Sequence, residues 1–411
     1  MTRLLFCVDH VFARAADGTI YTTGGKFPYA KWLEYLEYFD ELVVVSRGRG
    51  ATEEDIRKSV QASGPKVSFH LFDDLRGVKR LATLSEQRVA LAREVDAADA
   101  VIGRIPSEIG IAGCDQARRA GKPWLVELVA CPWDALWNHG SPLAKAYAPV
   151  MAHRMRRVAR QGKLLHYVTR EFLQRRYPPG GAFVCASNVM LPEPGEGLME
   201  RRIAGLQAWR RGDRPVVFGT IGALFTRLKG IDQAIEALAA ARDGLPPFEY
   251  RVLGEGAPDR LRAVAERFGI ADRVHFDGVL PGAAAVAGWL DGIDAYLQPS
   301  FQEGLPRATI EAMARGCLAI GSTVGGIPEL LPAGRMHKPG AAGELRERIL
   351  SLVQSPAERL AEESRRNFDV AQRYSYSASL AEKRRAYHAL REWVRRGTMP
   401  GEAGQPLPDA A

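Results

Sequence analysis

The stretch PSFQEGLPRATIEAMARGCLAIGSTVGGIPEL, residues 299–330, decides the fold of this chain. It continues from a short apolar run at 295–299 that predicts a buried strand, and its residues 307–315 carry apolar side chains at helical spacing. Pro306 stands where a proline suits the first turn of a helix. The stretch therefore predicts a strand, a loop and a helix whose start faces the end of the strand.

The loop and the helix each place one carboxylate near that junction, Glu303 and Glu311. The unpaired amides and positive dipole end of a helix start bind anions, and Gly304 lets the backbone approach a phosphate closely. A carboxylate would repel that phosphate, but it accepts hydrogen bonds from neutral sugar hydroxyls. The pattern predicts a ligand with a hexose at one end, a ribose at the other and phosphate between them, which is a sugar nucleotide.

These residues resemble the signature of retaining glycosyltransferases of family 4, an E-x7-E motif on a GT-B fold that is followed by GGIPEL. The resemblance implies that Glu303 lies against the donor sugar, that Glu311 binds the ribose, and that the backbone between them holds the diphosphate. That last role falls on Gly304, Leu305 and Pro306. Two glutamates at this spacing are also common on surface helices, but the flanking PS, EGLPRA, EAMA and GGIPEL favour the functional interpretation.

A second candidate group follows the apolar run at 216–221, in GALFTRLKGIDQAIEAL. Lys229 and Gly230 resemble the KG element of the family, whose lysine neutralises the diphosphate leaving group. A fixed cation suits this reaction because charge grows on the departing group. The family places an arginine after the glycine that ends this strand, whereas this chain has Ala223, so Arg227 is the candidate for the second cation. The alternative for Arg227 is a loop side chain that points to solvent.

Two further turns are weaker candidates. Gly24 and Gly25 lie between the first apolar run and a helix that bears Trp32. The resemblance implies that their backbone comes close to the donor phosphate or the acceptor, although any tight turn also uses glycine. Asp277 and Gly278 correspond to a turn whose backbone reads the nucleotide base in the family.

The acceptor side of the chain is less clear. Many members of the family carry a histidine after the fifth strand of the first domain, but this chain reads VELVACPWDALWNHG at 126–140 and has none at the strand end. Glu127, Asp134 and His139 are candidates for acceptor binding, with a strand-flanking salt bridge as the alternative for Glu127. Arg104 also ends a strand on the side where the domains should face each other, and a structural ion pair is its alternative.

Short apolar runs alternate with helical patterns along both halves of the chain, which is typical of doubly wound parallel sheets. Pro, Gly and charged residues interrupt this rhythm between 190 and 214. We therefore expect an α/β fold in which two Rossmann-like domains face a cleft. The resemblance implies that this fold is of the GT-B type and that a final helix crosses back to the first domain. The expected parts are an acceptor-side domain at 1–195, a nucleotide-sugar domain at 214–375, the crossover helix at 376–395 and a disordered tail at 396–411.

The length of 411 residues is greater than one compact hydrophobic core usually supports, so it indicates two domains. The hydrophobic content of 46% is sufficient to form both cores. The five cysteines are scattered and lack CxxC spacing, so they indicate neither disulfide bonds nor a zinc site. No run approaches the length of a membrane-spanning helix, and the first segment meets Asp9 too early for a signal peptide. We expect a cytoplasmic protein.

The net charge is +8, and the densest basic cluster is HRMRRVARQGK at 153–163, on a segment that predicts a helix after Pro149. The cluster predicts contact with anionic lipid at the inner face of the membrane, and a solvated helix face is the alternative. Nucleic acid is not expected as a partner, because the cluster lacks interleaved aromatic residues. Its arginines are Arg154, Arg156, Arg157 and Arg160.

The resemblance implies a retaining glycosyltransferase that moves a sugar from a nucleotide-sugar donor to a glycan or lipid-linked acceptor in surface polysaccharide biosynthesis. Catalysis is assigned to Glu303, Lys229 and Arg227, with no cofactor and no metal, because no Asp-x-Asp pair or histidine cluster is placed to hold one. The hypothesis for retention is a front-face mechanism, in which the leaving phosphate accepts the proton of the acceptor.

Two other classes of protein remain as alternatives. A sugar-nucleotide epimerase also pairs two Rossmann-like domains, but it would not share EGLPRATIEAM. A GT-B protein that binds a sugar nucleotide or a partner without turnover is favoured by the missing histidine and by Ala223, whereas the presence of Lys229, Glu303 and Glu311 argues against it.

Overall fold

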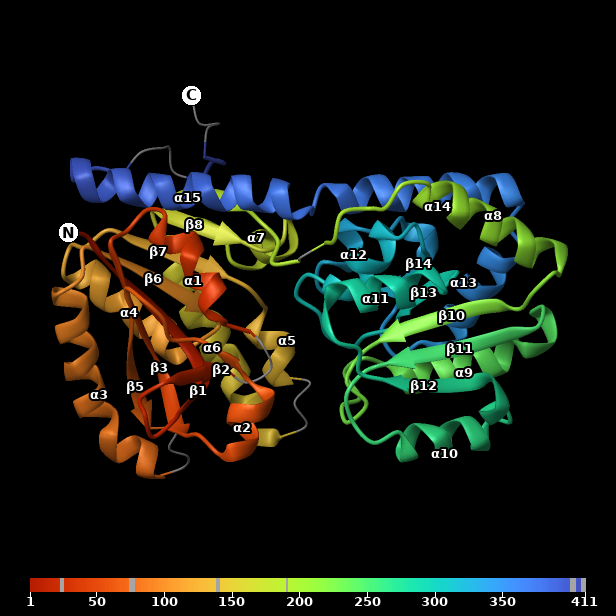
Figure 1. The fold of residues 1–411 in the computed structure, drawn as a ribbon, viewed down its shortest axis with the longest axis horizontal. Coiled ribbons are helices and arrows are strands. Elements are labelled where there is room, and N and C mark those ends of the chain that lie inside the picture. Colours follow the sequence, from red (N-terminus) through yellow and green to blue (C-terminus); the bar gives the residue numbers. More distant parts are fainter. Residues whose placement is uncertain (23–25, 74–77, 138–140, 190, 400–403, 408–411) are drawn as a thin grey trace.

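The structure is a computed structural model that describes the chain except for residues 23–25, 74–77, 138–140, 190, 400–403 and 408–411. Two α/β domains lie side by side, and helices α14 (Ala357–Gln372) and α15 (Tyr376–Arg396) run along the same side of both (Figure 1). The expected architecture of two Rossmann-like domains joined by a final helix is confirmed.

The first domain is built on a nine-stranded sheet. Its parallel part has the order β5-β3-β1-β6-β7-β8-β9, so the strand order reverses at β1, while the short β2 and β4 add an antiparallel extension. The strands are β1 (Arg3–Arg14), β2 (Ile20–Thr22), β3 (Glu41–Gly50), β4 (Val60–Gln61), β5 (Val67–Asp73), β6 (Ala100–Ile105), β7 (Trp124–Leu128), β8 (Leu164–Tyr167) and β9 (Ala182–Cys185). The helices are α1 (Tyr29–Leu36), α2 (Glu53–Lys58), α3 (Val78–Asp96), α4 (Glu108–Arg119), α5 (Pro132–Trp137), α6 (Pro142–Gln161) and α7 (Phe172–Arg176).

The second domain is built on a six-stranded parallel sheet of order β12-β11-β10-β13-β14-β15, which reverses at β10. Its strands are β10 (Val216–Ile221), β11 (Phe248–Leu253), β12 (Val274–Gly278), β13 (Ala295–Gln298), β14 (Leu318–Ser322) and β15 (Met336–His337). Its helices are α8 (Leu198–Arg211), α9 (Ile231–Ala241), α10 (Asp259–Arg267), α11 (Gly282–Asp291), α12 (Arg307–Ala314), α13 (Ala342–Val353) and α14. Short 3-10 turns are η2 (Arg242–Gly244), η3 (Ala271–Arg273), η4 (Ile327–Glu329) and η5 (Ala333–Arg335).

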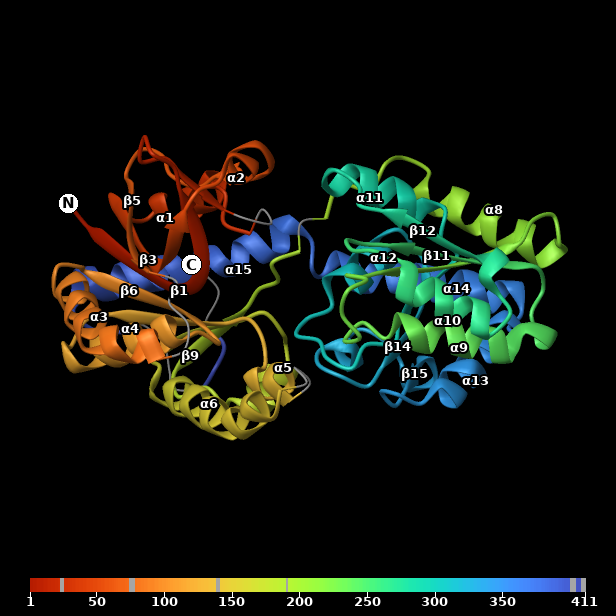
Figure 2. The same ribbon diagram turned by 90° about the horizontal axis from the view of Figure 1, so that it is seen from below.

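Helices cover both faces of each sheet, because alternate residues of a strand point to opposite sides. In β7, Glu127 meets Tyr35 of α1 and Tyr387 of α15, whereas Val126 lies against Gly162 at the end of α6. In the second domain α14 packs on α8 and α12, whereas α9 packs on α10 and α13. Figure 2 shows α8 and α11 toward one side of this domain and α9 and α13 toward the other. Burial on both faces explains why these strands read as continuous apolar runs.

Helix α15 is the last helix in the described part of the chain, and it packs on the first domain. Ser375 accepts a hydrogen bond from the amide of Ala378 at the helix start, and Gly397 ends the helix in the left-handed conformation. Tyr387 and Leu390 are buried in the core of the first domain. The expectation that the last helix crosses back to the first domain is therefore confirmed.

The structure differs from expectation at three places along the chain. The segment between the domains contains helix α8, whose Leu206 and Trp209 are buried in the second core, because its apolar residues keep helical spacing among many charged ones. Helix α6 starts at Pro142 and continues through Pro149 rather than starting after it. Pro149 is exposed, so water can satisfy the carbonyl that loses its helical partner.

The third difference concerns the tail expected to be disordered. Within it, residues 404–407 lie along β9, where the amide of Phe183 donates to the carbonyl of Gln405 at 3.0 Å and the amide of Leu407 donates to the carbonyl of Phe183 at 2.9 Å. The side chain of Leu407 is buried in the first core. The composition of the tail did not predict this contact, because it depends on the unpaired backbone groups of β9 at the edge of the first sheet.

Candidate active site

The candidate site lies where the strand order of the second sheet reverses. β10 and β13 are neighbours in the sheet although they are far apart in the sequence, and they run parallel. In open α/β sheets, ligands bind at the carboxyl ends of the strands at such a switch point. Lys229 follows β10 and Glu303 follows β13, so the topology brings these two predicted residues together.

Lys229 and Glu303 form an ion pair, with 2.7 Å between Nζ and Oε1. The same oxygen of Glu303 accepts hydrogen bonds from Ser300 Oγ at 2.7 Å and from Gln298 Nε2 at 2.9 Å. Glu303 is 8% exposed, whereas the side chain of Lys229 is 31% exposed. Ser300 and Gln298 therefore hold the Glu303 carboxylate in place, and the Lys229 ammonium group remains accessible.

Glycines allow the chain segments of this pair to come so close. Gly230 has φ of +66°, and a Cβ there would collide with the carbonyl oxygen of Pro299. At Gly222 a Cβ would lie 2.8 Å from Cγ of Lys229. The glycines of the KG element and of the strand end are therefore required for the lysine to reach the carboxylate.

Glu311 lies on α12 and is half-buried. Burial raises the pKa of its carboxyl group, and the nearby Arg307 only partly opposes this effect. Among the residues that the structure describes, Glu311 has no hydrogen-bond or ion-pair partner. A half-buried carboxylate without a protein partner can accept hydrogen bonds from ligand hydroxyls, as the ribose assignment requires.

The loop from Gly304 to Pro306 joins the two glutamates and is held by the GGIPEL segment. Gly326 donates its amide to the carbonyl of Gly304 at 2.7 Å, and Gly325, with φ of +58°, lies so close to Glu303 that a Cβ would collide with its carbonyl oxygen. Leu305 is buried, and Pro306 precedes α12 without a side-chain cap. The first amides of α12 are thus left without a side-chain acceptor.

Glu329 is a functional candidate that sequence reasoning missed, although GGIPEL had been singled out. Its carboxylate accepts hydrogen bonds from three consecutive amides at the start of α7, those of Arg170 at 2.7 Å, Glu171 at 3.1 Å and Phe172 at 2.7 Å. These contacts tie the second domain to the first next to the loop from Gly304 to Pro306. The sequence could not predict this contact, because Glu329 and its three partners are 157 to 159 residues apart along the chain.

Three predicted residues gain no role from the geometry. Arg227 is exposed in the loop after β10, and Ala223 lies on the same loop, so replacement of the family arginine by Arg227 stays a prediction. Gly24 and Gly25 lie outside the described residues.

On the acceptor side, the structure assigns Arg104 and Glu127 to an ion pair inside the first domain. Arg104 Nη1 lies 2.8 Å from Glu127 Oε2, and Glu127 is 1% exposed. Tyr35 and Tyr387 donate their hydroxyls to the other oxygen of Glu127 at 3.1 and 3.3 Å. Burial would raise the pKa of Glu127, but His166 and Arg104 outweigh it and hold that pKa well below its usual range. Arg104 and Glu127 therefore form the structural ion pair that was the alternative to acceptor binding.

The other acceptor-side candidates are also engaged or undescribed. Asp134 pairs with Arg176 at 2.7 Å, and His139 lies outside the described residues. In the basic cluster, Arg154 pairs with Glu108 at 2.7 Å and Arg157 pairs with Asp115. Two of the predicted lipid-binding arginines are therefore neutralised by α4.

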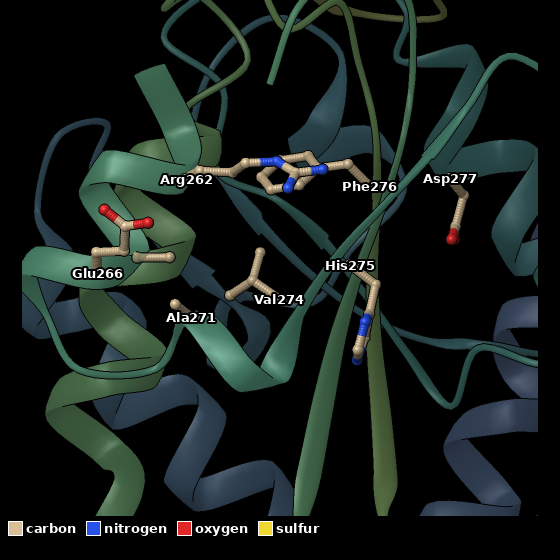
Figure 3. Close-up of a pocket in the computed structure, with 8 residues that line it drawn as sticks. Arg262, Glu266, Ala271, Val274, His275, Phe276 and Asp277 are labelled. Atoms are coloured by element: carbon tan, nitrogen blue, oxygen red, sulfur yellow. The ribbon is translucent and has the colours of Figure 1, made fainter. Parts of the chain in front are cut away.

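A pocket of about 430 Å³ lies away from these residues, between α10 and the edge strand β12 (Figure 3). The guanidinium group of Arg262 lies over the ring of Phe276, 5.8 Å from its centroid. Asp277, at the end of this strand, pairs with Arg251 at 3.0 Å and accepts a hydrogen bond from Trp289 Nε1 at 2.6 Å. Its side chain is thus occupied, which leaves only backbone groups of this turn for a base.

The second domain matches a known family. Residues 215–355 match the family described as Glycosyl transferases group 1, and this range contains Lys229, Glu303 and Glu311. Protein CapJ of Staphylococcus aureus is 27% identical over 339 residues, which cover 82% of this chain and 83% of CapJ. The amylovoran biosynthesis glycosyltransferase AmsK of Erwinia amylovora is 32% identical over 146 residues, which cover 33% of this chain and 36% of AmsK.

Solved structures share the arrangement of both domains. Anabaena HepE in complex with UDP superposes with a TM-score of 0.62 at 16% identity, covering 97% of this chain and 99% of HepE. WaaG, a glycosyltransferase involved in lipopolysaccharide biosynthesis, superposes with a TM-score of 0.60 at 14% identity, covering 94% of this chain and 99% of WaaG. At such identities the likeness establishes the shared GT-B fold.

Proposed function

This chain is a glycosyltransferase of the GT-B fold with a Glycosyl transferases group 1 domain, and from that premise we propose that it transfers a sugar from a nucleoside diphosphate donor with retention of configuration. The observation that carries the proposal is the pair of Lys229 and Glu303 at the switch point of the second sheet. The cation is partly open and the carboxylate is held by two further donors.

In this proposal the bound donor replaces the direct contact between the Lys229 ammonium group and the Glu303 carboxylate. Its diphosphate binds the ammonium group of Lys229, which stabilises the charge that grows on the departing phosphate. Glu303 keeps its bonds to Ser300 and Gln298 and accepts a hydrogen bond from a hydroxyl of the donor sugar. Glu311 accepts hydrogen bonds from the ribose, and Arg227 supplies a second cation to the phosphates.

Retention follows, in this proposal, from a front-face reaction. The acceptor hydroxyl attacks from the side of the leaving phosphate, the bond between the anomeric carbon and that phosphate breaks, and the phosphate oxygen takes the acceptor's proton. The reaction needs no divalent metal, because Lys229 and Arg227 supply the positive charge.

The names of similar proteins support the donor and acceptor classes. HepE has been solved with UDP and with UDP-glucose, so uridine donors are the first to test. AmsK is named for amylovoran biosynthesis and WaaG for lipopolysaccharide biosynthesis, which supports a surface glycan or a lipid-linked glycan as acceptor. In this proposal the reaction takes place in the cytoplasm, with peripheral contact to the membrane where a lipid-linked acceptor would be.

The test begins with donor binding. UDP, GDP, ADP and their sugars are added to the chain in a thermal-shift assay, since a ligand at a hundred times its Kd stabilises the fold by about 2.7 kcal/mol. We expect one nucleotide series to shift the transition and its sugar to be slowly hydrolysed without acceptor. Binding without hydrolysis or transfer would instead support the non-catalytic alternative.

The stereochemistry and the metal requirement are then measured on the product. The anomeric proton in an NMR spectrum should show the configuration of the donor, and EDTA should leave the rate unchanged. Glu303→Gln is the control, because it should lower turnover and leave nucleotide binding near normal. An inverted product, or activity that returns only with manganese or magnesium, would reject the proposed mechanism.

A further inference from the structure

The start of helix α7 takes its hydrogen-bond acceptor from the other domain. The first amides of a helix have no partner inside it, and Glu171, the residue before α7, supplies no side-chain cap. The amides of Arg170, Glu171 and Phe172 instead donate to the two carboxylate oxygens of Glu329, at distances between 2.7 and 3.1 Å. We call this contact the interdomain clamp.

The backbone on both sides of the clamp is held in one core. Glu329 is the last residue of η4, and Ile327 and Leu330 beside it are buried in a core that contains residues of both domains. Val168 and Leu173, on either side of the clamped amides, belong to the same core. A charged acceptor forms stronger hydrogen bonds to amides than a neutral one. The clamp therefore joins two well-packed segments by charge-assisted hydrogen bonds.

The clamp is continuous with the loop that carries Glu303. Three residues before Glu329, the amide of Gly326 donates to the carbonyl of Gly304 at 2.7 Å. At Gly325, a Cβ would collide with the carbonyl oxygen of Glu303. The backbone segments of Glu303 and Glu329 are thus in direct contact, so the clamp fixes the position of the Glu303 loop.

The first domain touches the same loop at the ends of β7 and β8, which are neighbouring strands. A Cβ on Gly304 would lie 3.1 Å from the carbonyl oxygen of Val129, which follows β7. A Cβ on Gly326 would lie 3.4 Å from Cγ2 of Thr169, which follows β8. Figure 1 shows α7 on the side of the first domain that faces the second. The Glu303 loop therefore lies where the two domains meet.

We propose that Glu329 is a positioning residue for sugar transfer. By clamping the Glu303 loop to the first domain, it sets the distance between the donor sugar and an acceptor bound to the first domain. This inference rests on the proposed function, in which Glu303 contacts the donor sugar. Reacting atoms must approach to about 3–3.5 Å, and a displacement of about 1 Å can slow a reaction about 100-fold. Glu329 itself touches neither substrate and acts through the backbone of the loop.

The clamp should matter more for transfer than for hydrolysis of the donor. Water reaches the donor sugar from any open side, whereas an acceptor held by the first domain reaches it only if the two domains keep their relative position. Loss of the clamp should therefore lower the rate of transfer more than the rate of hydrolysis. A purely structural role would leave the ratio of the two rates unchanged, because loss of folded protein lowers both rates equally.

The first test measures the clamp without any substrate. Amide hydrogen exchange of the full chain is followed by mass spectrometry in Glu329→Ala, in Glu329→Gln and in the unchanged chain. We expect exchange at 170–172 and at 303–305 to be about ten-fold faster or more in Glu329→Ala, and to change less in Glu329→Gln, because glutamine keeps one acceptor oxygen. An unchanged exchange rate at 303–305 in Glu329→Ala would overturn the proposal.

Two controls accompany this measurement. Exchange in the buried strand β13 should stay as in the unchanged chain, which shows that the variants are folded. Glu347→Gln makes the same change at an exposed glutamate of α13 and should leave the exchange at 170–172 and at 303–305 as it is. Faster exchange of these segments in Glu347→Gln would show that the effect is not specific to the clamp and would also overturn the proposal.

The second test measures the ratio of transfer to hydrolysis. UDP-glucose is the donor and octyl glucoside the acceptor, and the acceptor is omitted in the hydrolysis assay. We expect the ratio to fall roughly 10-fold to 100-fold in Glu329→Ala and to stay unchanged in Glu347→Gln. Calorimetry should give the same affinity for UDP in both variants as in the unchanged chain. Equal losses in both rates would show that Glu329 is only structural.

The two tests separate this proposal from the proposed function. If the unchanged chain turns over no nucleotide sugar, the proposed function fails, and the exchange rates at 303–305 still decide whether Glu329 holds the loop. If the chain transfers sugar with the same ratio in every variant, the proposed function stands and the positioning role of Glu329 is removed.

Discussion

Glu127 with Arg104 in the first domain and Glu303 with Lys229 in the second are two ion pairs toward the carboxyl ends of the sheets, and they differ in what else surrounds them. Glu127 pairs with Arg104 at 2.8 Å and Glu303 pairs with Lys229 at 2.7 Å. The side chain of Arg104 is 17% exposed and that of Lys229 is 31% exposed. The first pair is closed over by protein, and the second leaves its cation open.

The closing element is α15. Its Tyr387 donates to Glu127, and Tyr35 of α1 donates to the same oxygen, so the first pair is satisfied by fixed protein groups. Glu303 receives its extra hydrogen bonds from its own loop and strand, through Ser300 and Gln298. The first ion pair is therefore covered by a helix and satisfied by protein groups, whereas the second keeps an accessible ammonium group.

The largest effect is expected from Glu127→Ala, which should lower the free energy of unfolding by about 3–5 kcal/mol. The reason is that Arg104 and two buried hydroxyls lose their common acceptor. Urea unfolding measures the change. Glu347→Ala, at an exposed glutamate of α13, is the control and should stay within about 0.5 kcal/mol. A similarly small change for Glu127→Ala would show that the first pair is not structural.

Lys229→Ala should act on turnover instead. We expect a loss of roughly 100-fold to 1000-fold in kcat, about 2.7–4 kcal/mol, because the growing charge on the leaving phosphate loses its fixed cation. The same kinetic assay on Arg227→Ala decides whether there is a second cation, and the two losses should be less than additive if both contact the same phosphates. Normal turnover in Lys229→Ala would contradict the assignment of this pair to catalysis.

Glu311→Gln should weaken nucleotide binding by about 1.5–3 kcal/mol, since hydrogen bonds to a charged group are lost. Because burial raises the pKa of Glu311, the unchanged chain should also lose nucleotide affinity as the pH falls through that raised pKa, where the carboxylate becomes protonated. Glu311→Gln should remove this pH dependence. Calorimetric titration at several pH values checks both points, and unchanged affinity for UDP, GDP and ADP would exclude the ribose role.

A further effect, on the pH dependence of stability, is expected from Lys383 of α15. Lys383 lies 3.6 Å from Glu34, and burial, together with the nearby Lys31, lowers the pKa of Lys383 to about 8 from an ordinary 10.5. The unfolded chain then binds more protons than the folded one between these values, so the contribution of Lys383 to stability should rise as the pH rises from about 8 towards 10.5. Melting temperatures across this range should lose that rise in Lys383→Met. An identical pH profile would show that Lys383 is not buried in solution.

The sequence by itself determined the parts of this protein that depend on neighbours along the chain. The apolar runs predicted the parallel strands, because a strand buried on both faces must be continuously apolar. The loop and helix around Glu303 and Glu311, and the KG turn at Lys229, were also predictable, because their glycines are needed for close backbone contacts that the local pattern records.

Only the tertiary structure decided which charged groups meet. Whether Arg104 faces a ligand or pairs with Glu127 depends on strand register and on a helix that arrives more than two hundred residues later. The bonds from Glu329 to the start of α7 and the pairing of residues 404–407 with β9 likewise join distant segments. Local propensity carries no information on such contacts, because the partners come within hydrogen-bonding distance, and lose their water, only after the chain has folded.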